Sequence, residues 1–300
     1  MKKFLRALSL AAVLVMSAAV LFGCGQGGSS GKSGSSDQAA KESKGKVTLG
    51  YVEWDSEIAS THVVKNVLQD MGYQVDAVAV DAGVMWTGIG KGDFDAIVSA
   101  WLPNTHADYY AKVKDKVENL GPNLEGAKVG LVVPSYVTIN SIDEMNSVKD
   151  KFGGKIVGIE PGAGIMSASE KAIKDYGLDY TLQDSSSAAM AAALKTAVEN
   201  KEWIVVTGWT PHWMFAKWDL KYLDDPKGDF GGEEHIATIV RPGLKTDNPE
   251  AYQMLDNFSW TPDDMNSVML DIQNGMTPDE AAQKWIKAHK DIVDGWIPKA

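Results

Sequence analysis

The sequence predicts an α/β protein of two lobes, each a mostly parallel sheet flanked by helices, with two crossover strands at the hinge. The order strand, helix, strand, helix, strand occurs near residues 46–101 and again near residues 155–209. Alternation of strands with helices is typical of parallel sheets. Two apolar, β-branched runs, Ala127–Val137 and His235–Gly243, follow these units. We predict that these two runs are the crossover strands.

The first unit is predicted to contain three strands and two helices. Apolar residues three and four apart predict a helix at Ser56–Met71 with one buried face, ended by Gly72. The other elements are the strands Lys46–Tyr51, Tyr73–Val80 and Phe94–Ala100 and a short helix near Val84–Ile89.

The second unit repeats this order with little sequence identity, so we predict two similar lobes and not a tandem repeat. Its predicted elements are the strands Lys155–Glu160, Tyr180–Gln183 and Trp203–Gly208 and the helices Ile165–Tyr176 and Ser186–Asn200.

The remaining chain is predicted to be helical, over residues 248–258, 261–272 and 277–296. The segments Thr261–Asp264 and Thr277–Glu280 have the form of helix N-caps with proline at the first helical position. A chain that crosses over and returns would add these helices to the first lobe. We therefore expect lobe 1 to comprise residues 46–126 and 243–300, and lobe 2 residues 127–242.

The N-terminal residues 1–23 have the form of a signal peptide. Lys2, Lys3 and Arg6 precede a short apolar core, Ala7–Phe22, too short for a typical membrane span. Cys24, the single cysteine of the chain, follows in LFGC, which resembles a bacterial lipobox. This resemblance implies cleavage before Cys24 and a lipid on its sulfur; the alternative is an ordinary signal with an incidental cysteine.

Residues 24–45 are therefore expected to be a lipidated cysteine followed by a flexible tether, because Gly25–Gly45 lacks any large apolar residue. Without the three basic residues of the signal, 26 of the 29 basic residues remain against 40 acidic ones, a net charge of −14. An acidic, exported domain is a poor candidate for binding nucleic acid. Only Arg241 remains for the bidentate grip that anion sites often use.

Three tryptophans, Trp54, Trp101 and Trp209, end β-like runs, and Pro103 and Pro211 follow the last two. Ligands bind at strand ends in open α/β sheets, and indole faces attract cations that have no N–H to donate. Position alone leaves core packing and ligand binding equally open for these three. Packing is expected for Trp203, Trp260, Trp285 and Trp296, whereas Trp86, Trp213 and Trp218 stay open.

The segment EPGAGIM, before a helix beginning near Ile165, has two interpretations. Free amides at a helix N-terminus form an anion site, but a tight turn also requires glycine. His106, five residues after Trp101, is either a solvated loop residue or a hydrogen-bond donor to a ligand. His212 is a weaker candidate, which could instead support the loop beside Trp209.

The chain resembles glycine betaine-binding lipoproteins of ATP-binding-cassette (ABC) transporters in five segments that span nearly the whole exported domain. These are YVEWDSEIAST, SAWLPNTHADYY, GLVVPSYVTINSI, IVGIEPGAGIMSASEKAIKDYGL and VVTGWTPHWMFAKWDLKYLDDPK. Some members carry the two halves in the opposite order, so the correspondence is made segment by segment. The resemblance implies a periplasmic-binding-protein-like fold of type II. It also implies an aromatic cage at Trp54, Trp101 and Trp209, with the ligand carboxylate held by the backbone amides of Gly164 and Ile165 and by the imidazole of His106.

From this resemblance we expect a monomeric receptor, anchored by lipid to the outer face of the cytoplasmic membrane or located in the periplasm. It would capture glycine betaine, close over it and deliver it to an ABC permease for osmoprotection. Choline, carnitine or proline betaine are the alternative ligands. We expect no cofactor, no metal site and no catalytic residue, because the sequence has no G-x-S-x-G, no metal-binding His/Glu motif and no catalytic cysteine.

Overall fold

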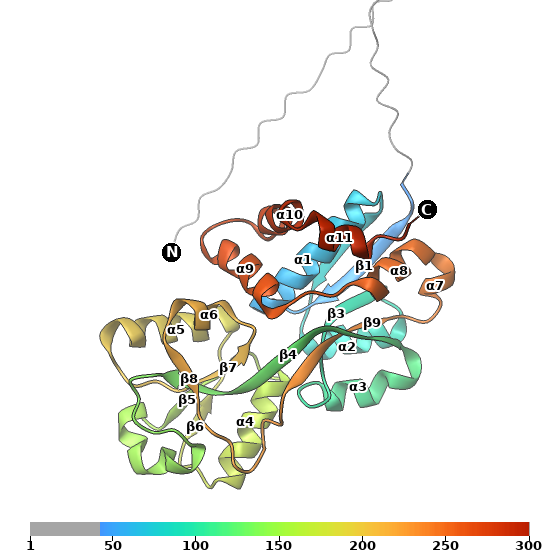
Figure 1. Ribbon diagram of the computed structural model, residues 1–300. Helices are drawn as coiled ribbons and strands as arrows, with labels where there is room; N and C mark the ends of the chain where they lie inside the picture. Colours follow the sequence, from blue (N-terminus) through green and yellow to red (C-terminus); the bar gives the residue numbers. More distant parts are fainter. Residues whose placement is uncertain (1–42, 300) are drawn as a thin grey trace, which may run out of the picture. The chain divides into compact units, whose positions relative to one another are not determined.

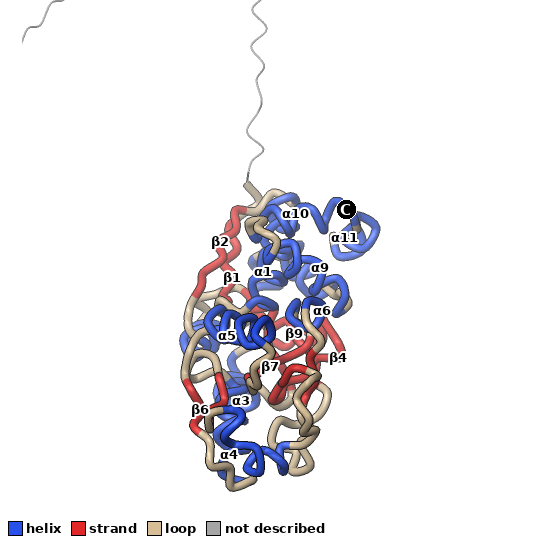
Figure 2. The backbone as a smooth tube through the Cα atoms, turned by 90° about the vertical axis from the view of Figure 1, so that its left-hand side faces the viewer, coloured by secondary structure: helices blue, strands red, loops and turns tan. Residues whose placement is uncertain are grey.

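A computed structural model describes residues 43–299 (Figure 1). The expected signal peptide, Cys24 and most of the expected tether lie outside these residues. Nine strands form one connected sheet in the order β2-β1-β3-β9-β4-β7-β5-β6, with β8 paired to β4. The edge strands β2 and β6 lie on the same side of the body (Figure 2).

The first lobe is built on three parallel strands. β1 pairs with both β2 and β3 in parallel. The elements are β1 (Lys46–Tyr51), α1 (Asp55–Asp70), β2 (Gln74–Ala79), α2 (Ala82–Lys91), β3 (Ala96–Leu102), α3 (Ala107–Val113) and the 3-10 turn η1 (Lys114–Lys116). The predicted three strands and two helices of this unit are confirmed, with bounds that differ by one or two residues. The short helix α3 was missed.

Two long strands connect the lobes. β4 (Glu118–Pro134) pairs antiparallel with β9 (Glu234–Val240) as far as Ala127, and from Lys128 it pairs antiparallel with β7 instead. Figure 1 shows β4 and β9 side by side between the lobes. The two predicted crossover strands are thus confirmed. β4 begins earlier than predicted, because three register shifts against β9 accommodate its Gly and Pro residues within the strand.

The second lobe repeats the arrangement with shorter strands. β5 pairs in parallel with β6 and β7. The elements are η2 (Ile142–Phe152), β5 (Lys155–Val157), α4 (Gly164–Asp175), β6 (Thr181–Gln183), α5 (Ser187–Asn200), β7 (Val206–Thr210), α6 (Trp213–Lys217) and β8 (Leu220–Tyr222). β5 is three residues shorter than predicted, and β7 begins after Trp203. The Trp203 indole packs against Phe152, with ring centroids 5.2 Å apart, and the Lys151 Nζ lies 4.3 Å from the centroid of the indole.

The C-terminal helices pack against α1 (Figure 1). They are α7 (Leu244–Asp247), α8 (Pro249–Asn257), α9 (Pro262–Gln273), α10 (Pro278–Ala288) and α11 (Lys290–Trp296). Thr261 and Thr277 each form a capping box, which confirms the two N-cap predictions. The single helix predicted over residues 277–296 is two helices, because His289 leaves helical geometry with φ −123° and ψ 41°.

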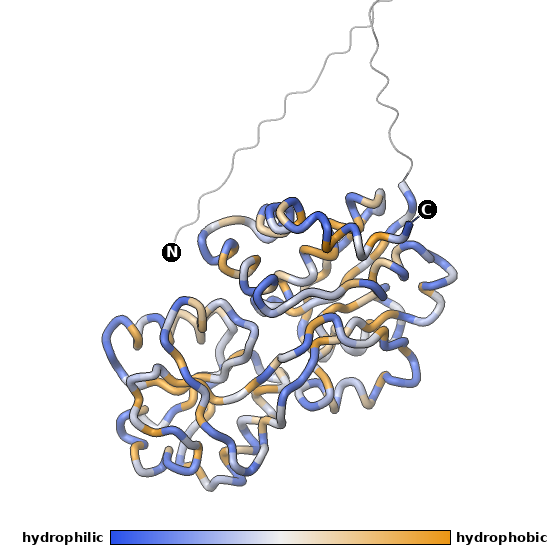
Figure 3. Tube along the Cα trace, viewed as in Figure 1, coloured by the Kyte–Doolittle hydropathy of each residue, from blue (hydrophilic) through white to orange (hydrophobic). Residues whose placement is uncertain are grey.

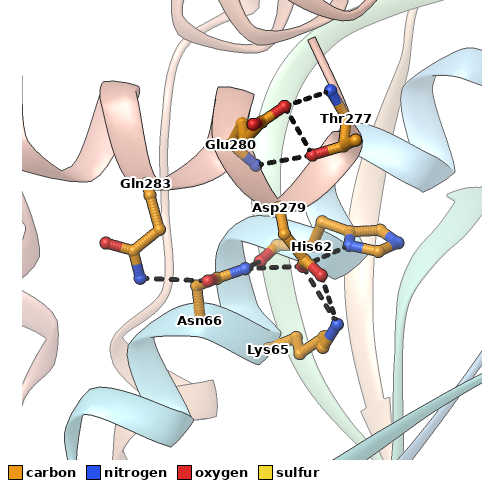
Figure 4. Close-up of polar contacts among 7 residues, drawn as sticks. All are labelled: His62, Lys65, Asn66, Thr277, Asp279, Glu280 and Gln283. Atoms are coloured by element: carbon orange, nitrogen blue, oxygen red, sulfur yellow. Dashed lines mark hydrogen bonds and ion pairs between the residues drawn. The ribbon is translucent and has the colours of Figure 1, made fainter.

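A polar network joins α10 to α1 (Figure 4). The Asp279 carboxylate contacts His62 Nδ1 at 2.7 Å and accepts from Lys65 Nζ at 2.8 Å and from Asn66 Nδ2 at 2.9 Å. Burial alone would raise the pKa of Asp279, but these neighbours hold it at about 2. The carboxylate is therefore ionised at neutral pH and anchors the C-terminal helices to α1.

Apolar residues concentrate along the central strands of both lobes, whereas outer turns are mostly hydrophilic (Figure 3). The alternation of strands with covering helices brings the carboxyl ends of β1, β3 and β7 toward the space between the lobes. None of the helices within residues 43–299 has the length and hydropathy needed to cross a bilayer.

Candidate ligand-binding site

A pocket lies between the two lobes. All six residues predicted to bind a ligand line it: Trp54, Trp101, His106, Gly164, Ile165 and Trp209. Five further lining residues were missed by sequence reasoning: Ser56, Thr105, Val129, Ile159 and Ala163. The pocket takes side chains from the α1 start, the β3–α3 segment, β4, the β5–α4 segment and β7.

Three indoles come from the carboxyl ends of parallel strands. Trp54 is the N-cap residue of α1, whereas Trp101 and Trp209 are the next-to-last residues of β3 and β7. The latter two therefore lie inside their strands and not just after them, as the sequence analysis had them. None is more than 7% exposed. Strands fix the Trp101 and Trp209 rings more firmly than a loop would, because pairing within the sheet holds their backbone.

Main-chain N–H groups at the start of α4 also border the pocket. Ala163 caps α4, which begins at Gly164, so the amides of Gly164 and Ile165 belong to the first helical turn. Such N–H groups have no partner within the helix, and the positive end of the helix dipole lies there. A neutral or charged acceptor in the pocket can therefore be held without a basic side chain.

Gly164 is required by close approach between the lobes. A Cβ at this position would overlap the carbonyl oxygen of Thr105 and lie 2.8 Å from its Cγ2. Thr105 belongs to the β3–α3 segment of the first lobe, whereas Gly164 opens α4 of the second. The glycine lets the two backbones meet, which a simple turn requirement would not explain.

His106 is buried, with 1% exposure, so it is not a solvated loop residue. Its Nδ1 accepts a hydrogen bond from the Trp101 N–H at 3.1 Å. The neutral ring therefore carries its proton on Nε2, which makes Nε2 the donor available to another group. Burial lowers the pKa of His106 to about 3, so the imidazole is neutral at physiological pH.

His212 does not line the pocket. It caps α6, where its Nδ1 accepts from the Met214 N–H at 3.2 Å, and it packs edge-on against Trp209 at 4.7 Å. This geometry fits the supporting role that the sequence left open. Trp213, one of the three tryptophans left unassigned, packs at a tilt against His212, with ring centroids 5.4 Å apart.

None of the lining residues carries a formal charge at neutral pH. A cation in the pocket would be stabilised by indole faces, and an anion by peptide dipoles and the His106 N–H. Aromatic faces provide attraction and apolar contact together, whereas a buried carboxylate would cost desolvation energy. The arrangement therefore favours a small zwitterion with a methylated nitrogen.

Two lobes joined by two crossover strands, with a pocket between them, define the class of substrate-binding proteins that enclose a small solute. Within this class the chain belongs to the family described as the substrate-binding domain of ABC-type glycine betaine transport systems, which it matches over residues 45–288. Proteins of this family work with an ABC permease outside the cytoplasm and are not enzymes.

Curated relatives agree with this assignment. The chain is 54% identical over 162 residues to the glycine betaine/carnitine transport binding protein GbuC of Listeria monocytogenes, across 53% of this chain and 54% of that protein. The match thus spans about half the length of that relative. It is also 26% identical over 286 residues to the glycine betaine/proline betaine-binding periplasmic protein of Escherichia coli, across 81% and 86% of the two chains.

Two solved structures have similar folds. Lactococcal OpuAC, in a closed form with glycine betaine, is 53% identical, with a TM-score of 0.81 over 84% of this chain and 99% of that one. An ABC-transporter choline-binding protein in complex with choline is 28% identical, with a TM-score of 0.77 over 84% and 91%. These similarities confirm the predicted two-lobed fold of type II.

Proposed function

We propose that this chain captures glycine betaine between its lobes and delivers it to the permease of an ABC importer, which would serve osmoprotection. The observation that carries the proposal is the uncharged pocket that joins three indoles to the first amides of α4. Trp54, Trp101 and Trp209 would enclose the trimethylammonium group. The amides of Gly164 and Ile165 and the Nε2–H of His106 would bind the carboxylate.

The cage alone does not account for useful affinity. Each cation–π contact contributes about 0.5 to 2 kcal/mol, so three contribute about 2 to 6 kcal/mol. Micromolar binding requires about 8 kcal/mol. Hydrogen bonds to the carboxylate and closure of the lobes must supply the difference, and a ligand without a carboxylate should bind more weakly.

The second candidate is the same kind of receptor for choline, carnitine or proline betaine. The names of the listerial and E. coli relatives and the choline complex favour it. Choline lacks the carboxylate, so it would use the indoles without the amides of α4. Carnitine and proline betaine keep both ends but differ in length and shape.

The test is a calorimetric titration of the purified protein with all four solutes, followed in parallel by tryptophan fluorescence. We expect saturable binding of glycine betaine with an affinity at least tenfold above that of choline, about 1.4 kcal/mol. Absence of heat and of any fluorescence change at millimolar glycine betaine would contradict the proposal. Tighter binding of choline would favour the second candidate.

We further propose that lobe 1 comprises residues 46–126 and 243–300 and lobe 2 residues 127–242. The exchange of partners by β4 between Ala127 and Lys128 supports the first boundary. The second boundary treats β9 as part of the crossover, although β9 also pairs with β3 of the first lobe. Limited proteolysis of the ligand-free protein should cut near these boundaries before it cuts within either lobe.

We propose that Cys24 is lipidated after removal of residues 1–23, and that residues 24–45 tether a monomeric receptor to the outer face of the membrane. The lone cysteine after a short apolar core supports this proposal. In the producing cells, Cys24→Ala should move the protein from the membrane to the soluble fraction. Unchanged fractionation would contradict lipid anchoring, and gel filtration of the exported domain tests the monomer.

A further inference from the structure

Two carboxylates outside the pocket, one from each lobe, accept hydrogen bonds from the opposite lobe. Asp55 is the first residue of α1 in the first lobe, and Glu160 follows β5 in the second. Neither lines the pocket that contains the cage. Each accepts hydrogen bonds from the other lobe.

Asp55 accepts two hydrogen bonds from the second lobe and has a third polar neighbour there. Its Oδ1 accepts from Trp213 Nε1 at 2.9 Å, and its Oδ2 accepts from Ser187 Oγ at 3.0 Å. His212 Nε2 lies 3.5 Å from Oδ2, on a ring that is fully buried. Within its own lobe Asp55 accepts from Gln273 Nε2 at 3.0 Å. Separation of the lobes would therefore leave it with Gln273 and water.

Glu160 makes the reverse connection. Its Oε2 accepts from Trp54 Nε1 of the first lobe at 2.9 Å, whereas its Oε1 accepts from the Ser187 N–H of its own lobe at 3.2 Å. Ser187 thus donates its N–H to one carboxylate and its hydroxyl to the other. The three residues Asp55, Ser187 and Glu160 form one continuous network across the cleft.

This network also contacts two of the three indoles. Glu160 bonds directly to the Trp54 ring, and His212, beside Asp55, packs edge-on against Trp209 at 4.7 Å. The Trp54 hydrogen bond exists only when the lobes are together, because donor and acceptor belong to different lobes. Closing the cleft and fixing the cage rings are therefore linked by the same contacts.

Ionisation of Asp55 supports this arrangement. Burial would raise the pKa of Asp55, but His212, Trp213 and Ser187 outweigh burial and lower it to about 2. The carboxylate is therefore charged at neutral pH and prefers the closed form, where its donors are. Hydrogen bonds to a charged acceptor are stronger than those between neutral groups.

We propose that Asp55 and Glu160 form a reciprocal clasp through Ser187 and Trp213, and that this clasp sets how long the ligand stays bound without touching it. The proposal rests on the proposed function for its kinetic readout. Its residues are positioning residues, which act through closure of the lobes and through the orientation of Trp54. The clasp should mainly slow dissociation, and it should change association by no more than about twofold, because the free protein exchanges between clasped and open forms and the ligand enters the open one.

The test compares the wild type with Ser187→Ala and Trp213→Phe, which remove one donor each and keep both carboxylates. Stopped-flow tryptophan fluorescence with glycine betaine should give a dissociation rate raised about tenfold and an association rate within about twofold. Asp55→Asn should behave similarly, and Asp55→Asn with Trp213→Phe should cost less than the sum of the two. Two matched controls should resemble the wild type. One is Trp218→Phe, whose ring centroid lies 5.3 Å from that of Trp213. The other is Asp81→Asn, at an N-cap residue whose side chain makes no cap hydrogen bond.

A second readout requires no ligand. Small-angle X-ray scattering of the free proteins should show a larger radius of gyration for the two clasp variants than for the wild type, with equal melting temperatures within about 2 °C. If the wild type fails to bind glycine betaine, the proposed function fails and the scattering comparison alone decides the clasp.

Equal radii together with equal dissociation rates for the wild type and both clasp variants would overturn the proposal. The proposal would also be overturned if Asp55→Asn raised the dissociation rate while Ser187→Ala and Trp213→Phe did not. Asp55 would then act through its charge and not through the donors that it holds.

Discussion

Replacement of Gly164 by alanine tests whether contact between the lobes governs binding. The added methyl group would overlap the Thr105 carbonyl oxygen, and it would lie 2.9 Å from the carbonyl carbon. A backbone group cannot rotate away as a side chain can, so one lobe must shift. Overpacking of this kind costs about 1 to 3 kcal/mol, which corresponds to about 5- to 150-fold in affinity.

The cost should appear in binding and not in folding, because the protein can relieve the overlap by opening. We therefore expect the ligand-free Gly164→Ala variant to keep the melting temperature of the wild type within about 2 °C. Calorimetry should show glycine betaine binding weakened by at least about fivefold. Gly295→Ala is the matched control, since a Cβ there meets nothing within 4 Å.

Gly164 has two proposed roles: it allows the lobes to meet, and its position sets the α4 amides against the ligand carboxylate. Binding of choline, which has no carboxylate, distinguishes the two. If the α4 amides hold the ligand carboxylate, Gly164→Ala should weaken glycine betaine more than choline, because displacement of the helix start harms only a ligand that uses it. Equal losses for both solutes would mean that Gly164 serves closure alone. Affinity for glycine betaine within about twofold of the wild type would refute the steric reasoning altogether.

Three further predictions concern the polar side chains of His106, Glu57 and Asp279. His106→Phe should weaken glycine betaine binding about 10-fold or more by removing a donor to the carboxylate. Because the pKa of His106 is about 3, wild-type affinity should be constant between about pH 5 and 8. A change in affinity with a midpoint near pH 6.5, measured by calorimetry, would contradict this. Burial, opposed by the Val52 N–H and Ser99, raises the pKa of Glu57 to about 8. Its protonated form therefore stabilises the fold at low pH, and this contribution is lost as pH rises through about 8. The melting temperature should fall less from pH 7 to 9 in Glu57→Gln than in the wild type, and equal falls would argue against this role. Asp279→Ala should lower the free energy of unfolding, measured in urea, by about 1 to 3 kcal/mol. Glycine betaine affinity should not change, since the Asp279 network joins α10 to α1 away from the pocket. A variant as stable as the wild type would mean that the network contributes nothing.

Local signals in the sequence predicted most elements of the fold. Threonine followed by proline and acidic residues gave the starts of α9 and α10, and Gly72 marked the end of α1. Failures occurred where a local signal is ambiguous. Gly121, Pro122 and Gly126 are typical of turns, yet β4 carries them through irregular pairing with β9. Such irregularities depend on the partner strand, which the sequence of β4 does not contain.

Six of the residues that line the pocket were named from the sequence, and their part in ligand binding stays a prediction; the contacts that support them were not foreseen. Trp54, Trp101 and Trp209 follow apolar runs that mark strand ends, so their convergence could be expected. Nothing near Asp55 in the sequence indicates that Trp213 and Ser187 donate to it, because those contacts depend on how the two lobes meet. A carboxylate directly after a predicted cage tryptophan was the only available signal.

The placement of the carboxylates has a physical reason. Asp55 or Glu160 inside the pocket would attract a methylated cation but would lose hydration on closure, at a cost that the ion pair need not recover. Outside the pocket, each carboxylate keeps at least two hydrogen-bond donors, and Glu160 bonds to the Trp54 ring. In the proposed site the cation would then contact ring faces, which lose little hydration. In the proposed site a zwitterion would be favoured, because the amides of α4 would hold its negative end, whereas a simple cation would gain only the contacts with the rings.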